Sequence, residues 1–239
     1  MGNIAGLVLA FLIATLGALL QGSVGFGLGL LSVPLLVLIH PVYVPGPVLL
    51  AAFFLNFFIL LRERHAIRIK NLHWAVVGRI VGAVIGALLL LVIPQKSVSI
   101  MFGVMVLTAI AINLAGFNLK MTSKNIFGAG IASGIMGTTS SIGGPPMALI
   151  YQKQKGPTIR GTLSGIFIFG TIVSLIALSV IGRFGLREIK ATAVLIPGVV
   201  LGFLLSNSST KILDRGFTRP AVLVTSAVSG IVVILRNLL

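Results

Sequence analysis

The sequence contains no cysteine and only three acidic residues among its 239 positions. Without cysteine there are no disulfides, no thiolate nucleophiles, and no zinc or iron–sulfur sites that depend on thiolates. The shortage of Asp and Glu leaves almost no material for paired-carboxylate catalysis, and no G-x-x-x-x-G-K-[ST] sequence for ATP binding occurs. We therefore expect a protein that is not an enzyme and that uses no cofactor and no metal.

Charge of either sign is also scarce, at 9% of the residues. A soluble domain carries about 25% charged residues, which cover its surface. Hydrophobic residues make up 57% of this chain, and its mean hydropathy is +1.16. The net charge of +15 comes mostly from Lys and Arg in short gaps between apolar runs, where anionic lipid headgroups hold such residues. We expect an integral membrane protein whose partner is the lipid bilayer and not a nucleic acid.

The apolar runs have the lengths of membrane helices, which need about 20 residues to cross a bilayer. The first run lacks the basic start and the short apolar stretch of a secretory signal, so we expect it to remain in the mature protein. The predicted fold class is an all-α polytopic membrane protein with about eight hydrophobic segments. These segments are Ile4–Ile39, Val44–Leu61, His73–Ile93, Val98–Phe117, Ile126–Tyr151, Gly161–Ile181, Ala191–Ser206 and Arg219–Leu235.

Two of the segments are interrupted by clusters of glycine and proline. Ile4–Ile39 is too long for one span and is broken around Gln21–Gly29, while Ile126–Tyr151 is broken around Gly137–Pro146. Proline removes an amide donor and restricts the residue before it. The sequence therefore predicts a broken helix at each place, and the prolines expected to fix the breaks are Pro34, Pro145 and Pro146.

Each broken segment stands first in its half of the chain, which suggests an internal repeat. A row of small residues supports it, because the same pattern returns about 120 residues later on one face of a helix. We predict two homologous transmembrane repeats, at residues 1–117 and 118–239. The matched residues are Lys70, Gly78, Gly82 and Gly86 with Lys190, Gly198, Gly202 and Ser206.

Two topologies remain open for the broken segments. If each segment crosses the membrane as one kinked helix, the Lys and Arg of the loops divide 10 against 7 between the two sides. If each enters and returns as a re-entrant hairpin, loops 62–70, 118–124, 153–160 and 211–219 share a side and the division is 12 against 5. The positive-inside rule favours the hairpins, which would also make the two halves inverted repeats.

The breaks are the best candidates for a binding site. Non-helical peptide at membrane depth persists only where it is buried in protein or lines a watery cavity. The helix that follows each break directs N-terminal amides and a partial positive charge at it, which suits a small anion. The alternative is that these small residues only pack helices together. The candidate substrate-binding residues at the breaks are Gln21, Ser23, Gly25, Gly27, Gly29, Thr138, Thr139, Ser140, Ser141, Gly143 and Gly144.

Arg79 completes the candidate site as the one charge inside an apolar run. It either attracts an anion into the cavity or extends to the membrane surface, since it lies less than two turns from the end of its segment. Three lone polar residues in spans are expected to form hydrogen bonds between helices rather than to bind a ligand: Asn56, Asn113 and Ser174.

The two glycine-rich runs carry a family resemblance. Gly25–Gly29 followed by Ser32-Val33-Pro34-Leu35, and Gly134–Gly137 followed by Ile142–Pro146, resemble the sulfite exporter TauE/SafE family, also called TSUP. The resemblance implies a transporter of small anions such as sulfite, sulfoacetate or thiosulfate in the plasma membrane of a bacterium or archaeon. An anion channel, or a membrane subunit that passes sulfur species to a partner enzyme, is the alternative. The oligomeric state stays open, with a homodimer as one arrangement.

Overall fold

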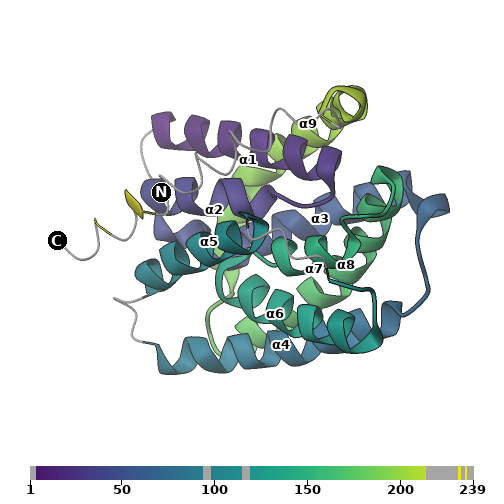
Figure 1. Cartoon of the computed structure of the whole chain (residues 1–239). Coiled ribbons are helices and arrows are strands. Elements are labelled where there is room, and N and C mark those ends of the chain that lie inside the picture. The colour runs from purple at the N-terminus through teal and green to yellow at the C-terminus, as the bar shows by residue number, and fades with distance from the viewer. Residues whose placement is uncertain (1–3, 94–97, 115–118, 214–230, 233–234, 236–239) are drawn as a thin grey trace.

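The computed structural model describes residues 4–93, 98–114, 119–213, 231–232 and 235, and in this part of the chain every regular element is helical. Figure 1 shows the helices lying side by side in a bundle. The helices are α1 (Ile4–Val24), α2 (Leu28–Ile39), η1 (Pro41–Tyr43), α3 (Gly46–Arg62), η2 (Arg64–Ala66), α4 (Leu72–Val92), α5 (Val98–Leu114), α6 (Ser123–Ser140), α7 (Gly144–Tyr151), α8 (Gly156–Val180) and α9 (Leu186–Leu213).

Among the described helices, four are long and apolar enough to cross a membrane: α1, α4, α8 and α9. Their outer faces carry exposed aliphatic side chains, such as Leu12 on α1 and Leu88 on α4. Exposed apolar rows of this kind are stable against lipid and not against water. The bundle therefore has the surface of a multi-pass membrane protein.

The first broken segment folds back on itself as a helical hairpin. The chain turns at residues 25–27, where Gly25 and Gly27 have φ angles of 98° and 136°. Only glycine adopts such angles without strain. The Ser32 hydroxyl donates to the Ile13 carbonyl oxygen at 3.2 Å, and Gly6 lies near Ile39. The two helices thus run antiparallel, and α2 returns to the end from which α1 starts.

The second broken segment turns at residues 141–143, between α6 and α7. Ser141 has a left-handed φ of 61°, and its amide closes the end of α6 on the Gly137 carbonyl oxygen at 2.7 Å. Pro145 and Pro146 lie in the first turn of α7, where a missing amide hydrogen costs nothing. Both breaks therefore lie within the stretches that the sequence predicts. Pro34 differs from the prediction, because it lies inside α2 rather than at a break.

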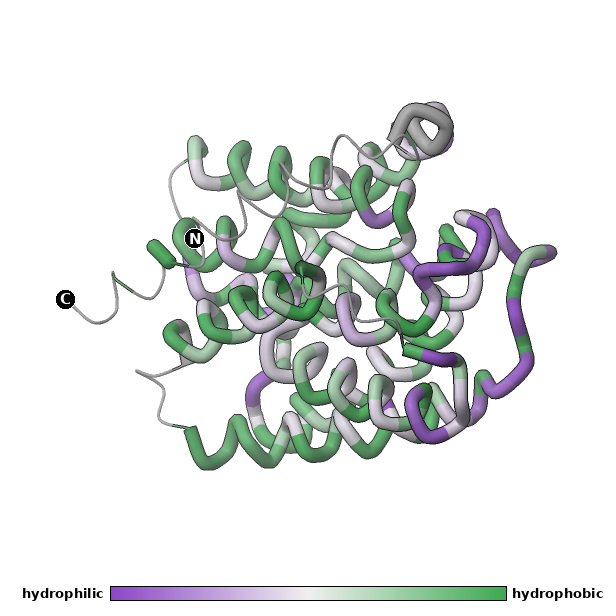
Figure 2. Tube along the Cα trace, viewed as in Figure 1, coloured by the Kyte–Doolittle hydropathy of each residue, from purple (hydrophilic) through white to green (hydrophobic). Residues whose placement is uncertain are grey.

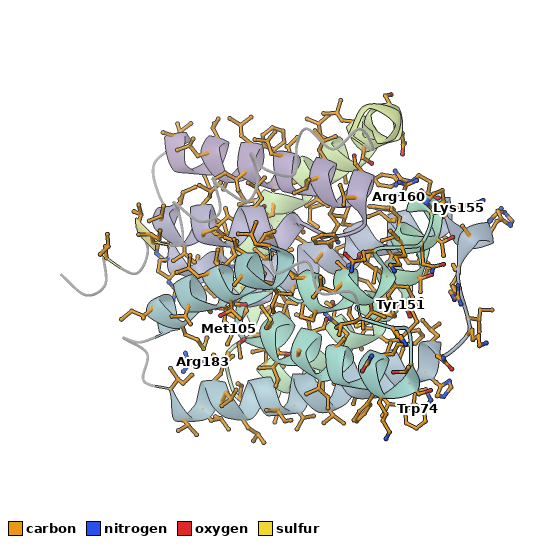
Figure 3. All side chains as sticks on the ribbon, in the orientation of Figure 1. Trp74, Met105, Tyr151, Lys155, Arg160 and Arg183 are labelled. Carbon is orange, nitrogen blue, oxygen red and sulfur yellow. The ribbon has the colours of Figure 1, made fainter. Side chains whose placement is uncertain are left out.

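The loops at one end of the bundle gather most of the polar residues, and we call this the basic end. Arg68 donates to Gln154 at 3.0 Å, and Gln154 contacts Met121 at 3.5 Å, so the loops before α4, α6 and α8 meet there. Figure 2 shows this hydrophilic end opposite the N-terminus, and Figure 3 places Arg160 and Lys155 there and Arg183 at the opposite end. These are three of the four loops that the hairpin topology places on one side; the fourth, 211–219, lies mostly outside the described residues.

Rows of small residues allow two helix pairs to pack closely. On α4, a Cβ atom at Gly82 would collide with the Ile131 carbonyl oxygen of α6. On α9, a Cβ atom at Gly202 would collide with the Thr15 carbonyl oxygen of α1. Close approach of backbones through glycine is the usual packing of membrane helices. The predicted eighth segment, Arg219–Leu235, lies almost entirely outside the described residues.

Candidate anion site between the two breaks

The two breaks, more than a hundred residues apart in sequence, touch each other inside the bundle. A Cβ atom at Gly29 would fall on the carbonyl oxygen of Ser141, and one at Gly144 would lie 2.8 Å from the Cβ atom of Phe26. A glycine of each break thus packs directly against the other break. Glycine at positions 29 and 144 is what permits this contact.

A small cavity of about 30 Å³ lies where the breaks meet, which is room for about two water molecules. Helices α1, α2, α3, α4 and α8 all contribute to its wall, together with the second break. The lining residues are Gln21, Phe26, Gly27, Gly29, Leu30, Leu49, Ala52, Asn56, Arg79, Ser141, Ile142, Gly143, Gly144, Pro145, Phe167 and Thr171.

The N-terminus of α2 faces this cavity. The Gln21 side-chain oxygen accepts from the Leu28 amide at 3.0 Å, while its side-chain nitrogen donates to Asn56 at 2.9 Å. The next two residues of α2, Gly29 and Leu30, line the cavity, and Gly27 supplies no side chain to cap the helix. The first amides of a helix lack partners within that helix and carry its partial positive charge. The wall of the cavity is therefore suited to a negative ligand.

Arg79 brings a full positive charge to the same place. The residue is 3% exposed, and its guanidinium stacks over the Phe167 ring at 4.8 Å from the ring centre. Its Nη1 donates to both the carbonyl oxygen and the hydroxyl of Ser133, while its Nε has no hydrogen-bond partner in the described part of the chain. Arg79 thus points into the protein and not toward the membrane surface, which rules out the interfacial alternative in this structure.

Glycines make the space that the Arg79 side chain occupies. A Cβ atom at Gly170 would overlap the Arg79 side chain, and one at Gly143 would lie 2.7 Å from its Nη1. The Ser133 hydroxyl, which accepts from Arg79, donates in turn to the Gly143 carbonyl oxygen. Residues of α6, α8 and the second break therefore hold the cation in one position. Such a fixed donor loses little freedom when it binds a ligand.

Several residues that the sequence suggested for this site lie elsewhere. Ser23, Thr139 and Ser140 donate to carbonyl oxygens of their own helix, at 2.8, 2.7 and 2.7 Å. Thr138 pairs with Ser174 at 2.6 Å, and Gly25 packs against the backbone of Arg160. None of these five residues lines the cavity. Hydroxyls inside a membrane helix commonly satisfy themselves in this way.

Sequence reasoning missed other residues of the cavity wall. Thr171 and Phe167 lie on α8, in a continuous apolar run that carries no break to mark them. Asn56 forms the expected hydrogen bond between helices but lines the cavity as well. Ser133, which positions Arg79, resembles any small residue of a membrane helix. Only the packing of α8 and α3 around the breaks identifies these residues.

Among the described residues no carboxylate lines the cavity, so none of them neutralises the charge of Arg79 there. Comparison with known families agrees with this chemistry, since the family model described as sulfite exporter TauE/SafE matches residues 10–233. The chain belongs to the sulfite exporter TauE/SafE family. This family of membrane transporters takes its name from sulfite export, and the match includes both breaks and Arg79. Searches of curated proteins and of solved structures found no match.

Proposed function

We propose that this chain is a secondary transporter or facilitator that moves a small anion across the plasma membrane of a bacterium or archaeon. The substrates we expect are sulfur-containing oxyanions or organosulfonates, such as sulfite, sulfoacetate or thiosulfate. One observation carries the proposal: the buried Arg79 guanidinium and the N-terminus of α2 meet at one cavity, and the described residues of its wall include no carboxylate.

The composition of the wall suits an anion that must also leave. A single cation attracts the anion, and neutral donors such as Gln21, Asn56 and Thr171 share the remaining contacts. Several cations would hold an oxyanion too tightly for rapid release, because conduction requires binding that is favourable yet easily reversed. The binding site in this proposal consists of the cavity-lining residues of both breaks together with Arg79.

We further propose that residues 1–117 and 118–239 are inverted repeats. Three packing relations support this. Gly82 of α4 meets Ile131 and Gly134 of α6, whereas Gly202 of α9 meets Thr15 and Ala18 of α1. Helix α3 packs on α8, its counterpart in the other half. Finally, α1 begins at the end opposite the basic end and α6 begins at the basic end, so the two hairpins enter from opposite sides.

In this proposal the basic end faces the cytoplasm, as the positive-inside rule expects. The anion would bind between the two breaks, near the middle of the bundle. Relative motion of the two halves would then expose the cavity to one side at a time, as in other transporters built from inverted repeats.

The first test is ligand-induced stabilisation of the purified protein in detergent. The panel is sulfite, thiosulfate, sulfoacetate, taurine, sulfate, acetate and chloride at matched ionic strength. A specific ligand at about 100 times its Kd adds about 2.7 kcal/mol of stability, which raises the unfolding temperature measurably. A rise confined to one or two sulfur-containing anions supports the proposal, and a flat response across the panel contradicts it.

Flux measurements in liposomes then separate the mechanisms. Uptake of the stabilising anion that saturates with its concentration supports a transporter, whereas single-channel currents would identify a channel. Flux that appears only after a partner protein is added would favour the membrane-subunit alternative.

A further inference from the structure

A network of two arginines and one glutamate closes the bundle at the basic end. Arg160 on α8 pairs with Glu63 at 2.8 Å, and Arg62 at the end of α3 pairs with the same carboxylate oxygen at 3.1 Å. The Arg160 and Glu63 side chains are only 6% and 12% exposed. Among the described residues these are the only ion pairs, and both use Glu63. The whole sequence has just three acidic residues.

The same arginines hold the end of α1. Arg160 Nη1 donates to the Ser23 carbonyl oxygen at 3.0 Å, and Arg62 Nη2 donates to that of Gly22. Arg62 Nη1 also reaches Ser206 on α9 at 2.9 Å. Four helices, α1, α3, α8 and α9, are thus joined through two guanidinium groups and one carboxylate.

The residues that this network holds follow directly in sequence on a residue that lines the cavity. Gln21 lines the cavity, and the next two residues, Gly22 and Ser23, accept hydrogen bonds from the two arginines. Gly25, at the start of the break, packs against the Arg160 backbone, with its Cβ position 3.2 Å from the Arg160 Cα atom. Any movement of Arg160 away from α1 would therefore uncover the break.

The opposite end of the bundle is held differently. On the side of the cavity that faces this end, the second break meets the residue before α3 through a neutral hydrogen bond, from the Ser141 hydroxyl to the Pro45 carbonyl oxygen at 2.8 Å. Two larger hollows of about 340 and 480 Å³ lie at that end, both lined by His40 and Arg187. In the part of the chain that the structure describes, the basic end is thus the one shut by ion pairs.

The Glu63 carboxylate occupies a place that an oxyanion could take. Both guanidinium groups donate through Nε to its Oε1 atom, beside a hollow of about 300 Å³ lined by Arg62, Glu63, Arg160, Phe203 and Asn207. Guanidinium groups bind carboxylates and other planar or tetrahedral oxyanions through the same paired N–H donors. Removal of the carboxylate would leave two part-buried cations with no counter-charge, which is an anion-binding site.

We propose that Arg62, Glu63 and Arg160 form both a gate and an entry site for anions at the basic end, where Glu63 keeps the gate shut by standing in for the transported anion. An arriving oxyanion takes the place of the carboxylate on Arg160, the link between α3 and α8 is released, and the path to the break opens. The inference rests on the proposed transport function and adds a second anion site to it.

The gate is tested by the chemical accessibility of position 23. The chain has no native cysteine, so Ser23→Cys introduces a single thiol behind Arg160. In reconstituted vesicles, a membrane-impermeant maleimide should label this thiol slowly. Adding Glu63→Gln should raise the labelling rate at least about tenfold, because a neutral amide gives up the ion pairs to both arginines.

Glu188→Gln is the matched control, since Glu188 accepts a hydrogen bond from Gly185 at the opposite end. It should leave the labelling rate unchanged. Glu63→Asp provides a second variant should the glutamine variant fail to fold, because it keeps the charge but is too short to bridge both arginines. Equal labelling in the Glu63 and Glu188 variants would overturn the gate.

The entry site is tested by sulfate, which does not react with maleimide. In the Ser23→Cys protein with Glu63 intact, sulfate should raise the labelling rate, because it displaces the carboxylate from Arg160, and chloride at the same ionic strength should not. The effect should vanish when Arg160→Met is added. Equal labelling rates in sulfate and in chloride would contradict the entry site.

Labelling requires no transport, so the two proposals can fail separately. A gate that opens in a protein without anion flux would contradict the proposed function alone. Normal flux in the native chain, with labelling that Glu63→Gln does not change, would contradict the gate alone.

Discussion

Helices α4 and α9 pack in the same manner but differ in one charge. Each lays a row of glycines on a broken helix, α4 on α6 and α9 on α1. Next to Gly78, α4 carries Arg79, which lines the cavity, whereas next to Gly198, α9 carries Val199, which is fully buried in the apolar core. The two helices thus share one packing pattern, and of the two only α4 carries a buried cation beside its glycines.

The difference separates what the fold requires from what a ligand requires. A buried charge is costly to desolvate, by several kcal/mol, and packing does not need it, as Val199 demonstrates. Ionisable groups inside a membrane protein are therefore most often functional. The unpartnered Nε of Arg79 fits this interpretation, because the protein itself leaves part of the guanidinium unsatisfied.

Removing the charge should have the largest effect on binding. We expect Arg79→Met to weaken binding of the stabilising anion by about a hundredfold, since a charge-assisted hydrogen bond contributes roughly 1.5–3 kcal/mol and Arg79 offers more than one. Val199→Met, at the matching position of α9, should leave the Kd unchanged. Calorimetric titration measures both. An unchanged Kd in the Arg79 variant would return Arg79 to a purely structural role.

The similarity of the two helices can be tested through their glycines. Gly82→Ala and Gly202→Ala should each lower the stability by roughly 1–3 kcal/mol, because both Cβ atoms would strike a carbonyl oxygen of the facing helix. Gly128→Ala on α6 is the control, since nothing lies within 4 Å of its Cβ position. Thermal unfolding in detergent gives the comparison. A variant at position 82 or 202 as stable as the Gly128 variant would refute the close packing of that helix.

Removal of single hydroxyl groups should have the smallest effect on anion binding. It should also show which residues around Arg79 belong to the site. Thr171→Val should weaken anion binding by about two- to tenfold, as expected for loss of one neutral hydrogen bond of 0.5–1.5 kcal/mol. Thr138→Val should lower stability without changing the Kd, because Thr138 bonds to Ser174 outside the cavity. The same titration measures both, and equal losses of affinity would place the site elsewhere.

The positions of the breaks could be predicted from the sequence, because their causes are local. Glycine at 25 and 27 and proline at 145 and 146 act through their own backbone geometry. Pro34 does not break its helix as predicted, because a single proline can be accommodated inside a packed membrane helix. The sequence predicts that hydroxyls such as those of Thr139 and Ser140 bind the ligand, but they bond to their own helix. The order of residues alone does not specify the direction in which each side chain points.

The sequence by itself determined a helical membrane protein of this family, with two glycine-rich breaks and almost no acidic residues, because composition and local backbone preferences act over short distances. Only the tertiary structure decided that the two breaks touch, that Arg79 points into their cavity, and that Glu63 pairs with Arg160. Those contacts join residues far apart in the chain. They depend on how closely the helices approach one another, which rows of small residues permit but do not by themselves specify.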